Sequence, residues 1–262
     1  MSTLTSADDD TIETIAAHLR SARRVAFLTG AGLSAESGLP TYRGVGGLYN
    51  DIMVDEGLPI EEILSGDMFQ RDPALTWKYL LEIERACRGA GANNAHRFMA
   101  ALEALCEVWV ITQNVDGFHT DAGSRQVIEL HGRLRELVCT GCGNRKNAAD
   151  FEAFPLPPRC GLCGEVIRPD VVLFGETLPS RAVAQYQREL LRGFDLIFTV
   201  GTSAGFAYIH EPVVAARRRG TITVEINPDR TPLSDLVVHR LACNALSATE
   251  GLAERLNMRR QH

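Results

Sequence analysis

The chain has 262 residues, of which 45% are hydrophobic and 23% charged, and its formal net charge is −6. This composition is typical of a folded globular protein and excludes a globally disordered chain. The acidic excess disfavours nucleic acid as a partner, because proteins that bind nucleic acid usually present a basic face. No apolar run approaches the ~18 residues of a membrane span, and the acidic start does not resemble a signal peptide. We therefore expect a cytoplasmic protein with no membrane partner.

Short apolar runs alternate with helix-like segments along most of the chain. Residues 11–20 have the apolar spacing of an amphipathic helix, and residues 94–105 and 181–191 are further predicted helices. Four apolar runs suit parallel strands that are buried on both faces. This alternation predicts an α/β fold with a doubly wound parallel sheet. The four runs are residues 25–29, 108–112, 196–200 and 222–226.

Two stretches interrupt the alternation. Residues 44–91 are helix-like without a clear strand, and residues 135–168 hold two cysteine pairs and a proline-rich break. We interpret both as insertions that together form a smaller domain, whereas residues 1–43, 92–134 and 169–262 form a Rossmann-like domain. A cleft between two such units is a common place for a ligand.

A glycine-rich turn follows the first predicted strand. Gly30, Gly32 and Ala35 match the pattern G-x-G-x-x-G/A, which lets backbone N–H groups approach a pyrophosphate at the start of a helix. A tight turn that binds no ligand would give the same pattern. A simple dehydrogenase has an acidic residue about 20 residues further on, whereas here the turn continues to Tyr42 and Arg43. The sequence therefore disfavours an NAD(P)H oxidoreductase.

Two Cys-x-x-Cys pairs predict a zinc site. Cys139 and Cys142 form the first pair, Cys160 and Cys163 form the second, and 17 residues separate the pairs. Four thiolates complete a tetrahedron and leave no position for water, so we expect one structural zinc ion. Unliganded thiols are the alternative for these residues. A zinc-ribbon module that binds protein or nucleic acid without turnover is an alternative for the whole chain.

Polar residues follow two predicted strands. Gln113, Asn114 and Asp116 come directly after the strand at 108–112, and His131 follows a short predicted strand at 127–130. Parallel strands deliver their carboxyl ends to the ligand crevice of an open α/β sheet. An imidazole there can act as a base at neutral pH. An Asx-turn and a structural histidine are the alternatives.

Two further strand ends carry polar residues. Thr202 and Ser203 follow the strand at 196–200, and Asn227 follows the strand at 222–226. Their hydroxyl and amide groups could contact a ribose or the edge of an adenine. Ordinary turns would explain the same residues.

The order of these blocks resembles the sirtuin family of NAD-dependent protein deacylases. The blocks are the glycine-rich turn at 30–43, Gln113-Asn114-Val115-Asp116, His131-Gly132, the cysteine pairs, residues 172–176, Gly201-Thr202-Ser203 and Asn227. The resemblance covers about residues 22–250. It implies a Rossmann-like domain with an inserted zinc ribbon and helical module. It also implies NAD as cofactor and acyl-lysine proteins or peptides as substrates.

The resemblance implies roles for individual residues. His131 would be the general base, Asn114 would lie beside it at the nicotinamide ribose, and Asp116 would hold the nicotinamide carboxamide. The residues implied in binding NAD are Gly30, Ala31, Gly32, Ser34, Tyr42, Arg43, Gln113, Asn114, Asp116, Gly201, Thr202, Ser203, Asn227 and Ala242. The residues implied in binding the substrate peptide are Val172, Phe174, Gly175, Glu176, Gly205 and Phe206.

The resemblance also implies a reaction, in which an acyl group passes from lysine to ADP-ribose and nicotinamide is released. Family members that prefer succinyl or malonyl groups carry Tyr-x-x-Arg in the helical insertion, whereas Tyr79 is followed here at that spacing by Glu82. We therefore expect the substrate to carry acetyl or another neutral acyl group. Protein mono-ADP-ribosyl transfer or NAD hydrolysis is the alternative on the same fold. We expect a monomer or a weak oligomer.

Overall fold

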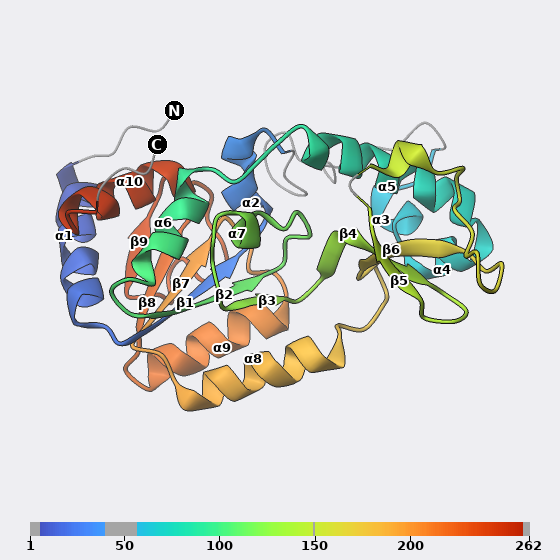
Figure 1. Cartoon of the computed structure of the whole chain (residues 1–262). Coiled ribbons are helices and arrows are strands. Elements are labelled where there is room, and N and C mark those ends of the chain that lie inside the picture. Colours follow the sequence, from blue (N-terminus) through green and yellow to red (C-terminus); the bar gives the residue numbers. More distant parts are fainter. Residues whose placement is uncertain (1–5, 40–56, 149, 259–262) are drawn as a thin grey trace.

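The computed structural model describes residues 6–39, 57–148 and 150–258, and its larger part is built on a six-stranded sheet (Figure 1). The strand order is β3-β2-β1-β7-β8-β9, and every pairing in this sheet is parallel. The strands are β1 (Arg24–Thr29), β2 (Glu107–Thr112), β3 (Val127–Glu129), β7 (Leu196–Val200), β8 (Ile222–Ile226) and β9 (His239–Leu241). The predicted α/β fold with a parallel sheet is confirmed, although β9 was not predicted.

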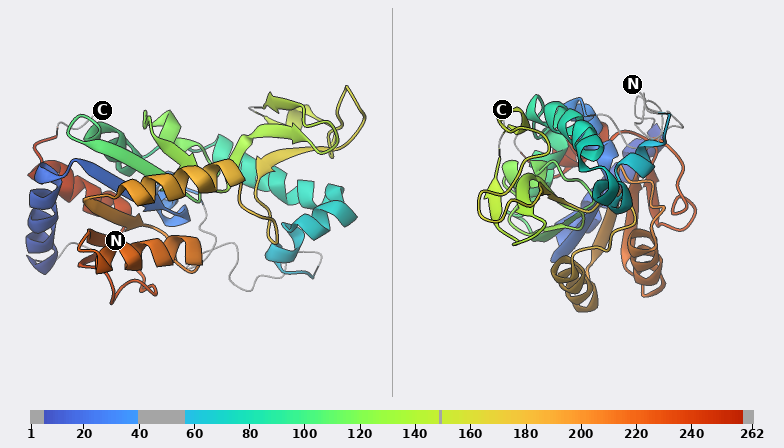
Figure 2. Two further views of the ribbon diagram at one scale, coloured as in Figure 1. Left: turned by 90° about the horizontal axis from the view of Figure 1, so that it is seen from below. Right: turned by 90° about the vertical axis from the view of Figure 1, so that its right-hand side faces the viewer.

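Helices cover both faces of this sheet (Figures 1 and 2). Side chains alternate along β1, so that Val25 and Phe27 pack on one helical layer and Ala26 and Leu28 pack on the other. This double burial is why the strands read as continuous apolar runs. The first layer comprises α1 (Ser6–Ser21), α6 (Asn94–Leu102) and α10 (Ala245–Arg255), and the second comprises α8 (Ser180–Arg192) and α9 (Ala207–Arg218).

The order of the strands reverses between β1 and β7. The chain passes from β1 outward to β2 and β3, and it returns on the other side of β1 as β7. At such a switch point the connections diverge and leave a crevice at the carboxyl ends of the strands. The short helices α2 (Ala31–Ser34) and α7 (Phe118–Asp121) and the 3₁₀ helix Ala35–Ser37 follow β1 and β2 at this edge.

A smaller unit lies at one end of the molecule (Figures 1 and 2). Its core contains Trp77, whose ring meets Phe151 edge-on at 5.2 Å between centroids and whose indole N–H donates to the carbonyl of Ile167 at 2.9 Å. The position of the domain boundaries stays a prediction. The unit comprises α3 (Ile60–Ile63), α4 (Gly66–Arg71), α5 (Pro73–Arg88), a 3₁₀ helix (Phe151–Ala153), and the antiparallel strands β4 (Gly132–Cys139), β5 (Arg145–Asn147) and β6 (Ile167–Val171).

The helices that the structure describes are too short or too polar to cross a membrane. The cytoplasmic location and the monomeric or weakly oligomeric state stay predictions.

Two buried histidines, one on α6 and one on α7, meet where these helices pack together. The rings of His96 and His119 are 4.8 Å apart between centroids, and Nε2 of His119 lies 3.0 Å from the hydroxyl of Thr29. The side chain of His96 completes a capping box with Asn93 at the start of α6. Burial lowers the pKa of His96 to about 4 and lowers the pKa of His119 well below its usual value. Both rings are therefore neutral in the folded protein at neutral pH.

We expect acid to destabilise the fold through these histidines. Their pKa values are lower in the folded state than in the unfolded state, so the stabilisation is complete above pH ~6.5 and is lost as the pH falls toward 4. His96 alone accounts for about 2 kcal/mol between pH 7 and pH 5. Urea unfolding across this range measures the effect. In the control variant His96→Gln, glutamine can still serve the capping box but does not titrate. Equal pH dependence in both proteins would contradict the assignment.

Candidate functional site

A cavity of about 940 Å³ lies between the crevice of the large sheet and the smaller unit. Its walls include Gly30 and Thr202 from the sheet edge and Leu80 and Ile83 from α5. The volume is at the upper end of the ~300–1,000 Å³ that is usual for small-molecule sites. A cavity with one polar and one apolar wall can hold a ligand that has both characters.

The glycine-rich turn is pressed against the end of β7. The N–H of Gly30 donates to the carbonyl of Val200 at 3.1 Å, and the N–H of Gly32 donates to the carbonyl of Gly201 at 2.8 Å. A Cβ atom on Gly32 would lie 2.8 Å from the Cα of Gly201, which no side chain tolerates. The glycines therefore serve the close packing of two strand ends, and their N–H groups are already used. The first N–H of α2, from Ala31, has no partner within that helix and can face a phosphate.

Three strand ends are joined by side-chain hydrogen bonds at the floor of the cavity. The amide of Gln113, after β2, donates to the hydroxyl of Thr202 at 2.8 Å, and the amide of Asn227, after β8, donates to the carbonyl of Thr202 at 2.9 Å. Ser203 is exposed beside them and lines the cavity. These contacts fix the polar wall before any ligand binds.

A buried polar network orients Asn114. Its amide nitrogen donates to the carbonyl of Gly30 at 3.1 Å and to the hydroxyl of Ser34 at 3.2 Å, and that hydroxyl donates to Asp116 at 2.7 Å. Asp116 also accepts the N–H of Phe118 at 2.9 Å, and burial raises the pKa of its carboxyl group. Both amide hydrogens of Asn114 are thus used, so a ligand can meet only its acceptor oxygen.

His131 follows β3 and lines the cavity as a half-buried side chain. Its Nε2 lies 2.7 Å from the hydroxyl of Tyr208. Burial lowers the pKa of His131, whereas the nearby backbone of Gln113 raises it and has the smaller effect. The imidazole is therefore neutral at pH 7 and able to accept a proton.

The wall opposite the sheet is apolar. Leu80 and Ile83 project from α5 into the cavity, and Leu134 and Phe174 lie among the other lining residues. Within the described parts of the chain, the only arginine or lysine in the lining is Arg230, which follows β8 on the side of Asn227. Among the described residues of this apolar wall, an acidic acyl group would find no cation.

The interpretation of Tyr79 and Glu82 was wrong. Tyr79 is buried in the core of the smaller unit, and Glu82 is exposed outside the cavity. Two residues that are three positions apart lie on the same face of a helix. Moving such a pair by one position along the chain turns the direction it faces by about 100° about the helix axis. The pair that faces the cavity is therefore Leu80 and Ile83, one position later in α5. The expectation of a neutral acyl group therefore rests on their apolar character and not on repulsion by Glu82.

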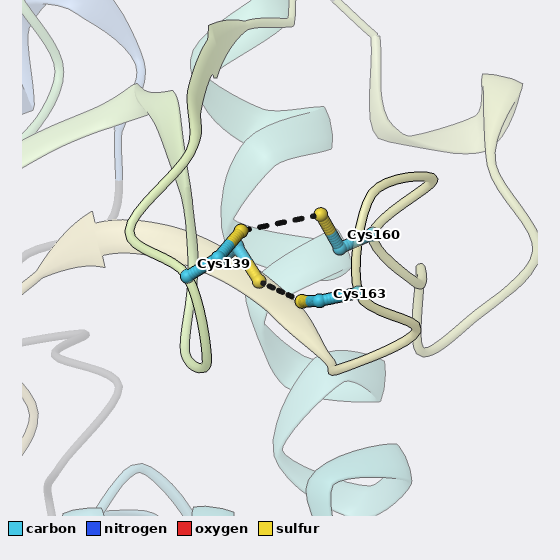
Figure 3. Close-up of side chains that lie close together, drawn as sticks. Cys139, Cys160 and Cys163 are labelled. Carbon is cyan, nitrogen blue, oxygen red and sulfur yellow. Dashed lines mark hydrogen bonds between the residues drawn. The ribbon is translucent and has the colours of Figure 1, made fainter.

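The four paired cysteines converge at the far end of the smaller unit. Their sulfur atoms all lie within 4.8 Å of one another, with 3.4 Å between Cys139 and Cys163 and 3.7 Å between Cys142 and Cys160. Figure 3 shows Cys139 on one loop and Cys160 and Cys163 on the other, with their side chains directed toward one another. A tetrahedron with Zn–S distances of about 2.3 Å has edges of about 3.8 Å. The donor set therefore fits a structural zinc ion.

Most of the residues that the sequence analysis singled out lie together. Ser34 and Asp116 stand behind Asn114 and do not line the cavity, and Gly205 and Ala242 lie outside the lining. Tyr42 and Arg43 lie outside the described residues. Those that line the cavity are Gly30, Ala31, Gly32, Gln113, Asn114, His131, Val172, Phe174, Gly175, Glu176, Gly201, Thr202, Ser203, Phe206 and Asn227.

Several lining residues were not predicted. No sequence motif points to Tyr208, because its contact with His131 joins parts of the chain that are far apart in the sequence. Asn244 and Ala245, at the start of α10, line the cavity where Ala242 was expected to do so. The Asn-Ala pair follows the three-residue strand β9, whose short mixed sequence gave no strand signal.

Comparison with known proteins shows the family of this chain. The family model described as "Sir2 family" matches residues 30–207. The chain belongs to the Sir2 family. A member from Pseudomonas aeruginosa, named NAD-dependent protein deacylase 2, is 51% identical over 239 residues, covering 90% of this chain and 93% of that protein. The resemblance to the sirtuins is thereby confirmed.

Solved Sir2 structures have the same fold. A Sir2 homologue in complex with NAD is 36% identical, has a TM-score of 0.84, and is matched over 94% of this chain and 93% of that one. A Sir2 variant with a deacetylated p53 peptide and 3′-O-acetyl ADP-ribose is 29% identical, has a TM-score of 0.83, and is matched over 93% of this chain and 97% of that one. The Sir2 fold therefore covers almost the entire chain.

We expect one zinc ion per chain, lost when a ligand is replaced. Cys160→Ser removes one of four donors, and the smaller unit should unfold at lower temperature because metal binding and folding are coupled there. Metal analysis and thermal unfolding measure both effects. Cys243→Ser is the matched control, since Cys243 is buried away from the cluster. Full zinc occupancy in Cys160→Ser would contradict the assignment.

Proposed function

We propose that His131 is the general base of this NAD-dependent protein deacylase. The observation that carries the proposal is a neutral imidazole in the cavity, beside the strand ends that hold Gln113 and Asn114. Its low pKa leaves Nε2 able to accept a proton at neutral pH. Neither mono-ADP-ribosyl transfer nor NAD hydrolysis requires a base directed at the ribose, so this side chain favours deacylation.

The polar wall suits NAD. Ala31 at the start of α2 and the exposed hydroxyl of Ser203 would meet the pyrophosphate, and Asn227 would meet the adenosine half. The acceptor oxygen of Asn114 would receive a hydrogen bond from the nicotinamide ribose or from an ordered water. Bound NAD supplies a ribose carbon that becomes electrophilic as nicotinamide departs, and its ADP-ribose part receives the acyl group.

The apolar wall suits an acyl-lysine. Leu80, Ile83 and Phe174 would cover the aliphatic chain and keep water away from the reacting groups. The amide oxygen of the acyl-lysine would bond to the ribose carbon that nicotinamide leaves, and His131 would take a proton from a neighbouring ribose hydroxyl, which then attacks the carbon of the former amide. Lysine then leaves as the free amine, and one water supplies the oxygen that the acyl group gave to the ribose carbon. The products are free lysine, nicotinamide and O-acyl-ADP-ribose. The substrate is an acyl-lysine in a protein or peptide.

The peptide backbone would run between residues 172–176 and Phe206. The N–H of Val172 already donates to the carbonyl of His131, and the N–H of Phe174 donates to the carbonyl of Leu64. The N–H of Leu173 donates to the carboxylate of Glu176, and the carbonyls of Leu173 and Phe174 accept from Glu176 and Gly66. Strand addition by a substrate would therefore use groups outside these bonds, such as the carbonyl of Val172 and the N–H of Gly175, whose φ of 82° allows the segment to turn there.

We expect His131→Ala to lower deacylation by about 10²–10⁴, the usual contribution of a general base. Incubation with NAD and an acetyl-lysine peptide, followed by mass spectrometry of O-acetyl-ADP-ribose, measures the rate. Exchange of labelled nicotinamide into NAD should persist, because nicotinamide leaves before the ribose proton is removed. His210→Ala is the control, since His210 does not line the cavity. Near-normal product formation by His131→Ala would refute the role.

We expect acetyl-lysine peptides to react with a kcat/KM at least ~10-fold above that of succinyl-lysine peptides. Burying a carboxylate against Leu80 and Ile83 without a partner costs enough to give this ratio. Ile83→Arg should narrow the ratio by supplying a cation, whereas Glu82→Ala should leave it unchanged because Glu82 lies outside the cavity. A wild-type ratio near one, or a large change in Glu82→Ala, would contradict this account of the wall.

A further inference from the structure

A tyrosine hydroxyl meets the atom of His131 that the proposed reaction needs. The hydroxyl of Tyr208 lies 2.7 Å from Nε2 of His131, and the two rings stand edge to face with their centroids 6.1 Å apart. Both side chains line the same cavity. The contact joins the strand ends of β3 and β7, because Tyr208 is the second residue of α9, which follows β7.

Tyr208 is held in place by contacts besides the one with the histidine. Its ring stacks on Phe206 with 5.3 Å between centroids and 13° between planes. Its backbone carbonyl accepts a hydrogen bond of 3.1 Å from the hydroxyl of Tyr186, which is buried on α8. The ring also packs against the apolar cluster beneath α8 and α9. The hydroxyl is therefore placed by its surroundings before any substrate arrives.

The distance between the Tyr208 hydroxyl and Nε2 fits a hydrogen bond whose direction depends on which nitrogen of His131 carries the proton. A neutral imidazole has one N–H, and a base that takes a proton through Nε2 needs that N–H on Nδ1 and the lone pair on Nε2. Burial raises the pKa of Tyr208 to about 12, so the phenol keeps its proton at neutral pH and donates it to Nε2.

We propose that Tyr208 is a positioning residue for deacylation, whose hydroxyl holds the His131 ring with Nε2 directed into the cavity until a ribose hydroxyl takes its place there. The proposal rests on the base role of His131 given above. Without the phenol oxygen, the ring loses the contact that fixes its orientation at the reacting side. A misplaced base slows only the step that uses it.

The variant Tyr208→Phe tests the proposal because it removes one oxygen and keeps the stacked ring. We expect formation of O-acetyl-ADP-ribose at saturating substrates to fall about tenfold, roughly the effect of one hydrogen bond. Exchange of labelled nicotinamide into NAD and the KM for peptide should stay within about twofold of wild type. Tyr79→Phe is the matched control, since it removes a phenol oxygen from the core of the smaller unit.

Three outcomes would overturn the positioning role: unchanged product formation, faster product formation, or an equal loss in product formation and nicotinamide exchange. The last would indicate general damage to the cavity. If His131→Ala retained its activity, the proposed function itself would fail, whereas inactive His131→Ala with unaffected Tyr208→Phe would remove only this inference.

¹⁵N spectra of histidine in the wild-type protein give a test that needs no variant. We expect Nε2 of His131 to be unprotonated at neutral pH, and a protonated Nε2 would contradict the proposal.

Discussion

The close packing of the turns after β1 and β7 decides where the cavity lies. Backbone atoms of Gly32 and Gly201 approach so closely that neither position accepts a Cβ, and Gly201 has a φ of 58°. Because the strand order reverses at the same place, the contact sits where an open α/β sheet leaves its crevice. Gln113, Thr202 and Asn227 are then delivered to the cavity by neighbouring strand ends, and His131 follows β3 at the same edge.

Buried hydrogen bonds fix the side chains at this edge of the sheet. The smaller unit contributes the apolar wall of the cavity. Ser34 and Asp116 stand behind Asn114 and hold its amide in one orientation. The apolar wall comes from α5, whose position depends on packing around Trp77 and on the zinc ribbon beyond it. Four sulfur ligands would leave a bound zinc ion no position for a reacting water, so we expect the metal to affect the cavity only through the packing of the smaller unit.

The sequence was most informative where one physical cause governs a whole segment. The parallel strands were predictable because burial on both faces requires apolar runs, and the zinc site was predictable because a tetrahedron of thiolates requires two closely spaced pairs. The short strand β9 was not, since it has only three residues, His239–Leu241, of which just Leu241 is fully buried. The spacing of Tyr79 and Glu82 did not reveal which side of α5 faces the cavity, because packing against the rest of the protein sets the rotation of the helix about its axis. Tyr208 lies 77 residues from His131, and no local pattern connects them.

The central claim is that the imidazole of His131 meets a ribose hydroxyl beside the acyl group. The most direct measurement is a crystal structure of the protein with an unreactive NAD analogue and an acetyl-lysine peptide. The account predicts Nε2 of His131 within about 2.6–3.2 Å of a hydroxyl of the nicotinamide ribose, with the acyl group against Leu80 and Ile83. A ribose bound away from His131, with its hydroxyl groups held by other side chains, would contradict the account.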